Sequence, residues 1–310
     1  MTMKTISIAL PAILGALLAA PAMAQDELPP SEDAIPDDGR RPAEDTYETS
    51  RGLALGTGGR AGAMGTSAVA YNPANLGLAR LYHVETFASY IPGQGAWTLG
   101  GAVADSVSNK VAAGMSFRGV YGDGNRNYRG YDGRLALGMA LSDAIALGMS
   151  GRFVRLRSRQ RNDAGERVGS SVKAFTLDAA LRVTPVEGLH IAALGYNLLK
   201  TGSPLAPTLL GGSASYTLNG MFTVAADVLV DLTTFDQAEL LVGGGVEFLA
   251  GGQVPIRAGY RRDQGRDIHQ LTLGLGYVDQ RVGVDLGLRQ NIASETKETA
   301  LVLSFRYHVQ

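Results

Sequence analysis

The sequence predicts an all-β fold, a 14-stranded antiparallel transmembrane β-barrel with a small N-terminal plug segment. Three observations predict it. Apolar residues alternate with small or charged ones from Leu81 to the end of the chain, fourteen segments show this alternation, and the connections between them are alternately short and long. A period of two is typical of strands, because successive side chains point to opposite faces.

The first 24 residues are interpreted as a secretory signal peptide. Lys4 supplies a positive charge, residues 6–20 are almost all apolar, and Ala22-Met23-Ala24 is typical of a cleavage site. The apolar run is short for a helix that crosses a bilayer. The chain contains no cysteine, so neither disulfides nor a lipid-modified cysteine are expected.

Residues 25–50 are predicted to form a flexible acidic tail in the periplasm. The segment is rich in proline and acidic residues, and it has too few aliphatic residues to offset the entropy of ordering. It is either a solvated spacer or an arm that binds a partner. Without Lys4 the chain carries 28 − 1 = 27 basic and 29 acidic residues, a net charge of −2. This balance gives no basic field for nucleic acid.

The barrel is predicted over residues 81–310, and its strand spacing fits the strands of about 9–11 residues that cross an outer membrane. In the last segment, Leu301, Leu303 and Phe305 share one face, whereas Ser304 and Arg306 share the other. The predicted strands are residues 81–92, 97–106, 110–122, 127–141, 144–156, 171–184, 188–199, 207–218, 221–233, 237–249, 253–263, 268–278, 281–291 and 297–309.

The connections indicate which kind of barrel this is. Those after even-numbered strands are short, such as SVSN and TPVEG, whereas several after odd-numbered strands are long and polar, such as YGDGNRNYRGYDG. Short turns at one end, longer loops at the other and an even strand number are typical of the outer membrane of Gram-negative bacteria. Both termini are then expected in the periplasm. Aromatic residues also gather at both strand ends, as amphipathic rings do at membrane interfaces.

Charged residues of the strands are predicted to face the lumen, because an arginine in lipid near the midplane costs about 2–4 kcal/mol. The near balance of signs favours pairing between neighbouring strands over selectivity for ions of one sign. The lumen-facing residues are Glu85, Arg118, Arg134, Arg152, Asp178, Arg182, Asp227, Asp231, Glu239, Glu247, Arg257, Arg261, Asp285, Arg289 and Arg306. The candidate pairs are Arg152 with Asp178, Glu247 with Arg257, and Asp285 with Arg306.

Many other lumen positions are glycine, and small inward residues leave room. They include Gly138, Gly148, Gly243, Gly245, Gly274, Gly276, Gly283 and Gly287. Fourteen strands enclose more volume than the eight-stranded barrels that side chains alone can fill. Another part of the chain is therefore expected to occupy the lumen.

The glycine-rich stretch GTGGRAGAMGTSAVAYNPANLG, residues 56–77, is the candidate. A dinucleotide-binding loop would need a strand before it, a helix after it and an acidic residue about 20 positions on, and this context is missing. Small residues can instead pack tightly or turn sharply. We expect residues 51–80 to fold into the lumen as a plug.

This stretch resembles the N-terminal hatch of the FadL-type superfamily, which includes long-chain fatty acid transporters and PorV/PorQ-type proteins. The pattern RAxGMGGA…AxxxNPAxLA is matched by Arg60, Gly62, Met64 and Gly65, and then by Asn72, Pro73 and Ala74. The resemblance implies a fourteen-stranded barrel and passive, hatch-gated uptake of hydrophobic, fatty-acid-like molecules.

The resemblance also implies lateral exit through a gap near the third strand. There Gly114 and Gly119 would either permit a bulge or relieve crowding. The chain departs from the family in a shorter segment between Gly65 and Tyr71 and in outer loops without long helical insertions. These departures leave two alternatives open, a non-transporting scaffold for exported or surface proteins of the PorV kind and a small general pore.

Transport requires an apolar pocket, for which Leu194, Tyr196, Leu229 and Leu241 are the candidates, although the facing of the first two is ambiguous. Neither an enzyme nor a cofactor or metal site is expected, since the four histidines lack metal spacing and no G-x-S-x-G or P-loop motif is present. Expected partners are outer-membrane lipid and lipopolysaccharide, a hydrophobic small molecule or an exported protein. The basic loop with Arg155, Arg157, Arg159, Arg161 and Arg167 either contacts lipopolysaccharide phosphates or is simply solvated.

Overall fold

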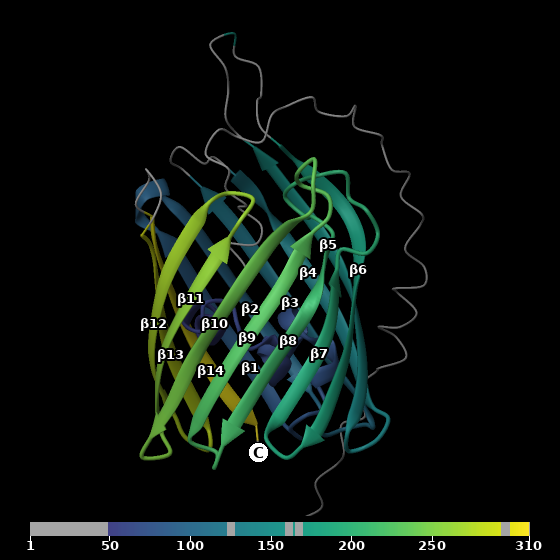
Figure 1. The fold of residues 1–310 in the computed structure, drawn as a ribbon, viewed down its shortest axis with the longest axis vertical. Coiled ribbons are helices and arrows are strands. Elements are labelled where there is room, and N and C mark those ends of the chain that lie inside the picture. Colours follow the sequence, from purple (N-terminus) through teal and green to yellow (C-terminus); the bar gives the residue numbers. More distant parts are fainter. Residues whose placement is uncertain (1–48, 123–127, 159–163, 165–169, 293–297, 310) are drawn as a thin grey trace, which may run out of the picture. The chain divides into compact units, whose positions relative to one another are not determined.

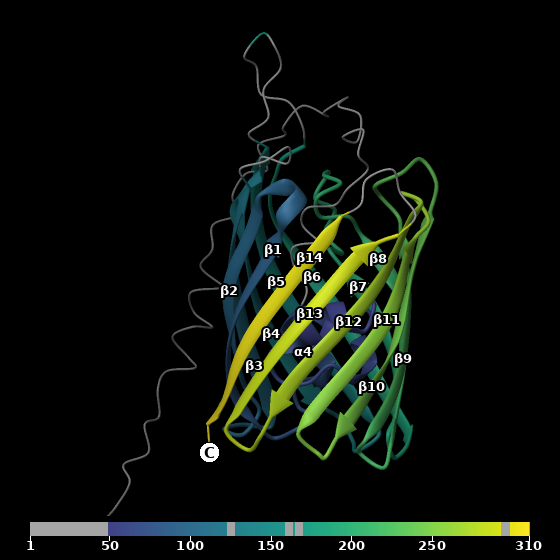
Figure 2. The ribbon, with the colours of Figure 1, turned by 90° about the vertical axis from the view of Figure 1, so that its left-hand side faces the viewer.

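The computed structural model describes residues 49–122, 128–158, 164, 170–292 and 298–309. Their fourteen strands form one closed antiparallel barrel, in which each strand pairs with its neighbours in sequence and β1 pairs with β14 (Figures 1 and 2). The predicted all-β, fourteen-stranded antiparallel barrel is confirmed. The predicted signal peptide and residues 25–48 of the predicted tail lie outside the described residues.

Each strand begins and ends within three residues of its predicted range. The strands are β1 (Tyr82–Ile91), β2 (Ala96–Asp105), β3 (Val111–Gly122), β4 (Tyr128–Ala140), β5 (Ile145–Ser158), β6 (Val172–Val186), β7 (Leu189–Tyr196), β8 (Leu209–Leu218), β9 (Phe222–Asp231), β10 (Glu239–Ala250), β11 (Val254–Asp263), β12 (Ile268–Val278), β13 (Val282–Asn291) and β14 (Thr299–Val309). Short turns gather at one end of the barrel, here called the turn end, and the other connections lie at the loop end (Figure 1).

Strand β7 ends three residues before its predicted boundary, because Asn197 adopts a left-handed backbone conformation with φ 51°. The Asn197 amide donates to Asp178 Oδ1 at 2.8 Å, which holds the turn against β6. The loop then folds inward, so that Leu205 and Ala206 are buried with Val154 and Leu156 of β5. The β7–β8 loop therefore packs against the inner wall at the loop end.

The two faces of the wall differ in the way the alternation predicts. Large apolar side chains face outward, and Phe117 and Leu273 are each 57% exposed. Charged side chains face inward and are buried, and Arg118 and Arg289 are at most 1% exposed. The barrel is thus apolar on its outer surface and polar inside.

Residues 49–76, here called the inner segment, lie inside the barrel (Figures 1 and 2). They form four short helices, α3 (Ser50–Ala54), η1 (Arg60–Gly62), α4 (Thr66–Tyr71) and η2 (Pro73–Asn75). Helix α3 contacts β11 to β14, α4 contacts β1 to β4, η2 contacts β4 to β6, and η1 contacts β7 to β9. No helix of the described residues is long and apolar enough to cross a membrane.

The inner segment begins earlier than the predicted plug. The Thr49 hydroxyl accepts a hydrogen bond from the Gly52 amide at 3.1 Å and caps helix α3. Ser50 is 1% exposed. These two residues, which the sequence assigned to the tail, therefore pack inside the barrel.

Inward glycines give the inner segment its space. A Cβ added at Gly148 would lie 2.7 Å from Ala74 Cα and would overlap the Pro73–Ala74 peptide. A Cβ at Gly245 would lie 2.8 Å from Leu55 Cα, and Gly138, Gly243, Gly274 and Gly287 likewise face residues of the inner segment. Gly276 and Gly283 instead lie beside wall side chains, Asp285 and Arg306. The glycine backbone therefore lets the inner segment lie directly against the wall.

We predict that Gly148→Val lowers the free energy of unfolding by about 1–3 kcal/mol, because the added side chain must displace the Pro73–Ala74 backbone. The matched control is Gly133→Val on the neighbouring strand, where an added Cβ would make ordinary contacts of 3.7 Å or more. Denaturant unfolding monitored through Trp97 fluorescence measures both. Equal stability of the two variants would contradict this packing.

Candidate functional site

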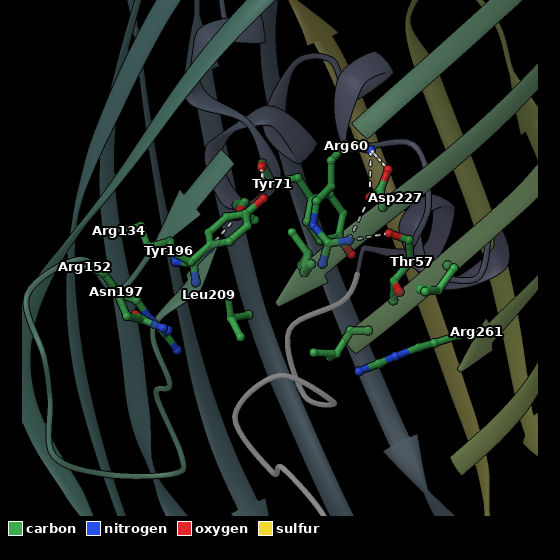
Figure 3. A pocket seen from close by; sticks show the side chains of 15 residues that line it. Thr57, Arg60, Tyr71, Arg134, Arg152, Tyr196, Asn197, Leu209, Asp227 and Arg261 are labelled. Atoms are coloured by element: carbon green, nitrogen blue, oxygen red, sulfur yellow. Dashed lines mark hydrogen bonds and ion pairs between the residues drawn. The ribbon is translucent and has the colours of Figure 1, made fainter. Parts of the chain in front are cut away.

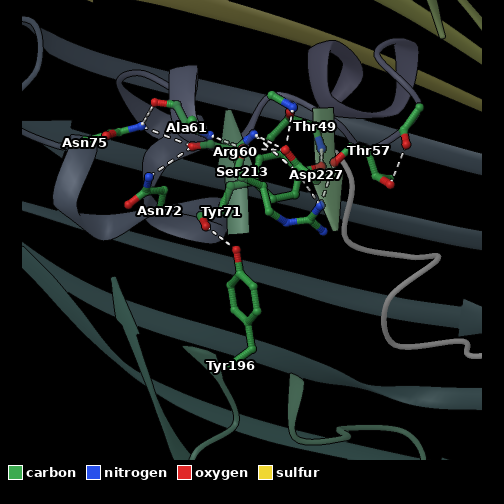
Figure 4. A network of polar contacts seen from close by, with 12 residues as sticks. Thr49, Thr57, Arg60, Ala61, Tyr71, Asn72, Asn75, Tyr196, Ser213 and Asp227 are labelled. Atoms are coloured by element: carbon green, nitrogen blue, oxygen red, sulfur yellow. Dashed lines mark hydrogen bonds and ion pairs between the residues drawn. The ribbon is translucent and has the colours of Figure 1, made fainter. Parts of the chain in front are cut away.

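An ion pair joins the inner segment to the wall near the centre of the lumen. Arg60 Nη1 donates to Asp227 Oδ2 at 2.8 Å and to the Thr57 carbonyl at 2.6 Å. The Gly59 amide donates to Asp227 Oδ1 at 3.0 Å. Ser213 Oγ donates to Asp227 and accepts from the Ala61 amide at 2.7 Å (Figure 4). One buried carboxylate on β9 thus holds the first turn of η1.

The Arg60 guanidinium stays charged in this site. It lies over the rings of Tyr71 and Tyr196, with its Cζ 5.3 and 5.8 Å from their centroids. Burial by itself lowers the pKa of Arg60, but Tyr196, Asp227 and Tyr71 outweigh burial and raise the pKa above its ordinary value. Arg60 therefore faces Asp227 as a charged guanidinium between two aromatic rings.

The Asn-Pro-Ala stretch folds the inner segment back on itself. Asn72 and Asn75 Nδ2 each donate to the Arg60 carbonyl at 3.1 Å, and Asn75 Nδ2 also donates to the Ala61 carbonyl at 2.8 Å. Pro73 begins η2, a position that its fixed φ favours. These bonds tie the two ends of the glycine-rich stretch together around η1.

A second ion pair anchors α3. Arg51 donates through Nη2 and Nε to the two oxygens of Glu247, at 3.0 and 3.1 Å, in a bidentate arrangement. Burial lowers the pKa of Arg51, but Glu247 and Asp285 outweigh it and raise the pKa. Glu247 also accepts from Arg257, which in turn pairs with Asp285, and Asp285 pairs with Arg306. The predicted partners Glu247–Arg257 and Asp285–Arg306 lie together in this chain of charges.

Further hydrogen bonds fix the inner segment on other strands. Arg134 Nη1 donates to the Ala70 carbonyl at 2.6 Å, and Thr272 Oγ1 donates to the Ala54 carbonyl at 3.0 Å. Thr66 donates to Glu85. The inner segment is therefore bonded around the lumen, on β1, β4, β8, β9, β10 and β12.

The remaining predicted hatch residues have local roles. Gly65 has φ 58° and lies directly beside His83, so a side chain there would be strained and would clash. Gly62 lies beside Ser215 of β8, and Pro73 and Ala74 lie over β4 and β5. Met64 is 46% exposed. The glycines and the Pro73–Ala74 backbone therefore act through close packing, whereas Arg60 and Asn72 act through their side chains.

One predicted charge pair is wrong. Arg152 pairs with Asp132, with Nε 2.8 Å from Oδ2, and within the described residues it forms no ion pair with Asp178. Asp132 and Asp178 each lie two residues from the position opposite Arg152, on β4 and on β6. Ser150 lies opposite Asp178 and donates to it at 3.1 Å. Asp132 also binds Arg118 at 2.8 Å and is the centre of this cluster.

Asp132 is absent from the predicted lumen residues, although its alternation with Arg134 on β4 gives it the same face. Arg51, Asn75 and Ser213 were also not singled out, and only the resemblance offered a signal for Asn75. Of the other predicted lumen residues, Asp231, Glu239, Arg261, Arg182 and Arg289 are buried in the interior.

A small cavity of about 60 Å³ remains between the inner segment and the wall. Thr57, Arg60 and Tyr71 border it from the inner segment, and Figure 3 shows Tyr196, Asn197 and Arg152 on the opposite side. A ligand site for a drug-sized molecule has about 300–1,000 Å³. This cavity therefore has room for a few waters and is too small for a drug-sized molecule.

Three of the four predicted pocket residues line the cavity, and the fourth does not. Tyr196, Leu229 and Leu241 border the cavity together with Leu209, which was not predicted. Leu194 faces inward and packs in the same buried cluster as Ala61 and Ala74, but it does not border the cavity. It is also one of the residues around a broad, open apolar groove of about 710 Å³ over β4 to β8, whose exposed members, such as Met149 and Leu181, face outward.

The third strand is not interrupted. Strand β3 pairs with β2 and β4 without a register shift at Gly114 or Gly119, so of the two alternatives given for these glycines the bulge is not found. Gly114 instead makes room for Val69 of α4. Among the described strand pairs, the register shifts between Val183 and Val186 at the turn end of β6.

No group of three metal-binding side chains converges anywhere in the described part of the chain. His83 and His308 lie on neighbouring strands, but their rings stack with centroids 4.4 Å apart. Of the predicted basic loop, Arg155 and Arg157 belong to β5, whereas Arg159, Arg161 and Arg167 lie outside the described residues.

Solved structures share the fold of this barrel. The Ralstonia pickettii toluene transporter TbuX is similar with a TM-score of 0.62 at 15% identity, over 86% of this chain and 99% of that one. The CymD monoaromatic hydrocarbon channel has a TM-score of 0.61 at 14% identity, over 89% and 98%. A Pseudomonas aeruginosa FadL homologue has 0.57 at 11%, over 84% and 97%.

No family model and no curated protein matches the sequence. The predicted resemblance is therefore supported by similarity of fold to these transporters and channels.

We predict that Asp227→Asn loosens η1, because it leaves the buried Arg60 without its counter-charge. Breaking a buried pair costs about 3–5 kcal/mol. Hydrogen exchange at the Gly59 and Ala61 amides should accelerate accordingly. Asp231→Asn is the control, since this carboxylate on the same strand accepts from the Thr233 and Thr234 amides of the β9–β10 loop. Unchanged exchange in Asp227→Asn would rule out the anchor.

Proposed function

We propose that this chain is an outer-membrane barrel of a Gram-negative bacterium that takes up hydrophobic small molecules passively, with the inner segment as its hatch. The observation that carries the proposal is the occupied lumen, where the inner segment lies on a glycine wall, is anchored by two ion pairs and borders a cavity of about 60 Å³. The similar structures include a toluene transporter and a monoaromatic hydrocarbon channel, which supports an apolar substrate.

The surface of the barrel suits a membrane. Its outward side chains are large and apolar, and aromatic side chains lie near both ends, such as Trp97 and Tyr121 at the loop end and Phe248 and Tyr307 at the turn end. Such girdles are typical of outer-membrane barrels. We place the turn end and both termini in the periplasm, after removal of a signal peptide of residues 1–24.

We place the opening of the hatch at η1, beside the cavity that three leucines border. Helix η1 is held by Asp227 and Ser213, and the cavity beside it is bordered by Leu209, Leu229 and Leu241. An apolar molecule that enters from the loop end gains contact with these leucines as η1 withdraws. When the hatch moves, Glu247 keeps Arg257 as its counter-charge. Asp227 keeps the Ser213 hydroxyl, so the ligand contacts must offset the loss of the Arg60–Asp227 ion pair. Fatty acids and monoaromatic hydrocarbons both fit this chemistry.

A non-transporting scaffold for exported or surface proteins is the second candidate. The observation that favours it is the pairing of a closed lumen with a broad apolar groove on the outer side of β4 to β8. A scaffold would keep its lumen closed permanently and would use the outer wall. The two functions therefore differ in whether the inner segment must move.

We predict that a disulfide between Gly62→Cys and Ser215→Cys abolishes uptake. An added Cβ at Gly62 lies 3.3 Å from Ser215 Cβ, close to the spacing of about 3.5–4.5 Å in disulfides. The natural chain has no cysteine, so this pair is the only one that can form. Uptake of toluene and of oleate into proteoliposomes should stop on oxidation and return on reduction.

Each single cysteine variant, treated with the same oxidant, is the control. Equal uptake by the oxidised and reduced double variants would show that the hatch need not move. If the unmodified barrel carries neither probe, the scaffold is favoured.

A further inference from the structure

Outward-facing cations gather at the loop end of three neighbouring strands. Arg155 and Arg157 lie on β5, and Lys173 lies directly opposite Arg155 on β6. Arg129 on β4 lies opposite Arg157. Arg157, Lys173 and Arg129 are exposed, and Arg155 is half-buried. We name Arg155, Arg157 and Lys173 the cation cluster.

A row of aromatic side chains lies beside this cluster on the same outward face. The rings of Phe117 and Tyr131 are 6.0 Å apart, those of Tyr131 and Phe153 are 5.9 Å apart, and Phe175 lies opposite Phe153. Arg155 follows Phe153 by two residues, which is about 7 Å along a strand. Aromatic rows mark the membrane interface, so the cluster lies in the layer of the lipid headgroups.

The cluster differs from the arginines on the inner face of the same strands. There Arg118 and Arg152 share Asp132. None of the ion pairs among the described residues includes a member of the cation cluster. Like charges directly opposite each other destabilise a sheet. An anion between Arg155 and Lys173 would remove this cost.

We propose that the cation cluster binds the phosphate groups of lipopolysaccharide in the outer leaflet. Arginine suits phosphate through its paired N–H donors, and lysine adds a point charge. The acyl chains of the same molecule lie along Phe117, Phe153 and Phe175 below the phosphates. The inference rests on the proposed membrane placement, with the loop end outside the cell.

Binding of lipid A to the purified barrel in detergent, followed by native mass spectrometry, tests the site. The variant is Arg155→Gln/Arg157→Gln/Lys173→Gln. Each cation near an anionic lipid surface raises the binding constant about fivefold, so lipid A should bind the triple variant roughly 100-fold more weakly. Lipid A without its phosphates should bind the unmodified barrel as weakly as lipid A binds the variant.

The matched control is Arg80→Gln/Lys110→Gln/Arg281→Gln, which removes the same charge at the turn end, where all three residues are exposed. It should bind lipid A like the unmodified barrel. Heat-modifiable migration on gels shows that both variants are folded. Equal binding of lipid A by the cluster variant, or equal binding of the dephosphorylated lipid, would overturn the proposal.

Uptake measured on the same variants separates this inference from the proposed function. If the unmodified barrel binds lipid A no better than the cluster variant but takes up the probes normally, only the proposed lipid site is ruled out. If the unmodified barrel takes up neither probe but binds lipid A through its phosphates, only the proposed transport function is ruled out.

Discussion

A closed barrel of fourteen strands encloses more space than its inward side chains can fill, and the rest of the structure depends on how this space is occupied. The inner segment occupies this space, and its backbone lies directly against the wall. Glycines such as Gly148 and Gly245 remove side chains from the wall where Ala74 and Leu55 of the inner segment lie. Larger wall residues at these positions would overlap the inner segment. Without the inner segment, the lumen would be an open pore.

Charge supplies the second constraint. Buried ions are stable only with partners, so the inward face must balance its own signs. The inner segment takes part in this balance, because Arg60 pairs with Asp227 and Arg51 pairs with Glu247. The two anchors are not equivalent. Glu247 keeps Arg257 when the inner segment leaves, whereas Asp227 keeps only the Ser213 hydroxyl among the described wall residues. Movement at η1 is therefore more costly electrostatically than movement at α3, and a ligand at η1 must offset that cost.

The sequence predicted the strands well because alternation reports directly which side chains face lipid and which face the lumen. Inward glycines likewise predicted an occupied lumen. It could not predict which charges meet, because Asp132 and Asp178 each lie two residues from the position opposite Arg152, and Arg152 meets Asp132. Nor could alternation predict the left-handed Asn197 that ends β7, or the bonds from Asn72 and Asn75 to the Arg60 carbonyl. These features are isolated, so they produce no repeating pattern in the sequence.

The most direct test of the account is single-channel conductance in a planar lipid bilayer, compared between the mature barrel and the same barrel without residues 51–78. The account predicts that the intact barrel conducts little, because its lumen is filled, and that the deletion opens a large, stable conductance. Equal conductance of the two barrels would contradict the claim that the inner segment closes the lumen.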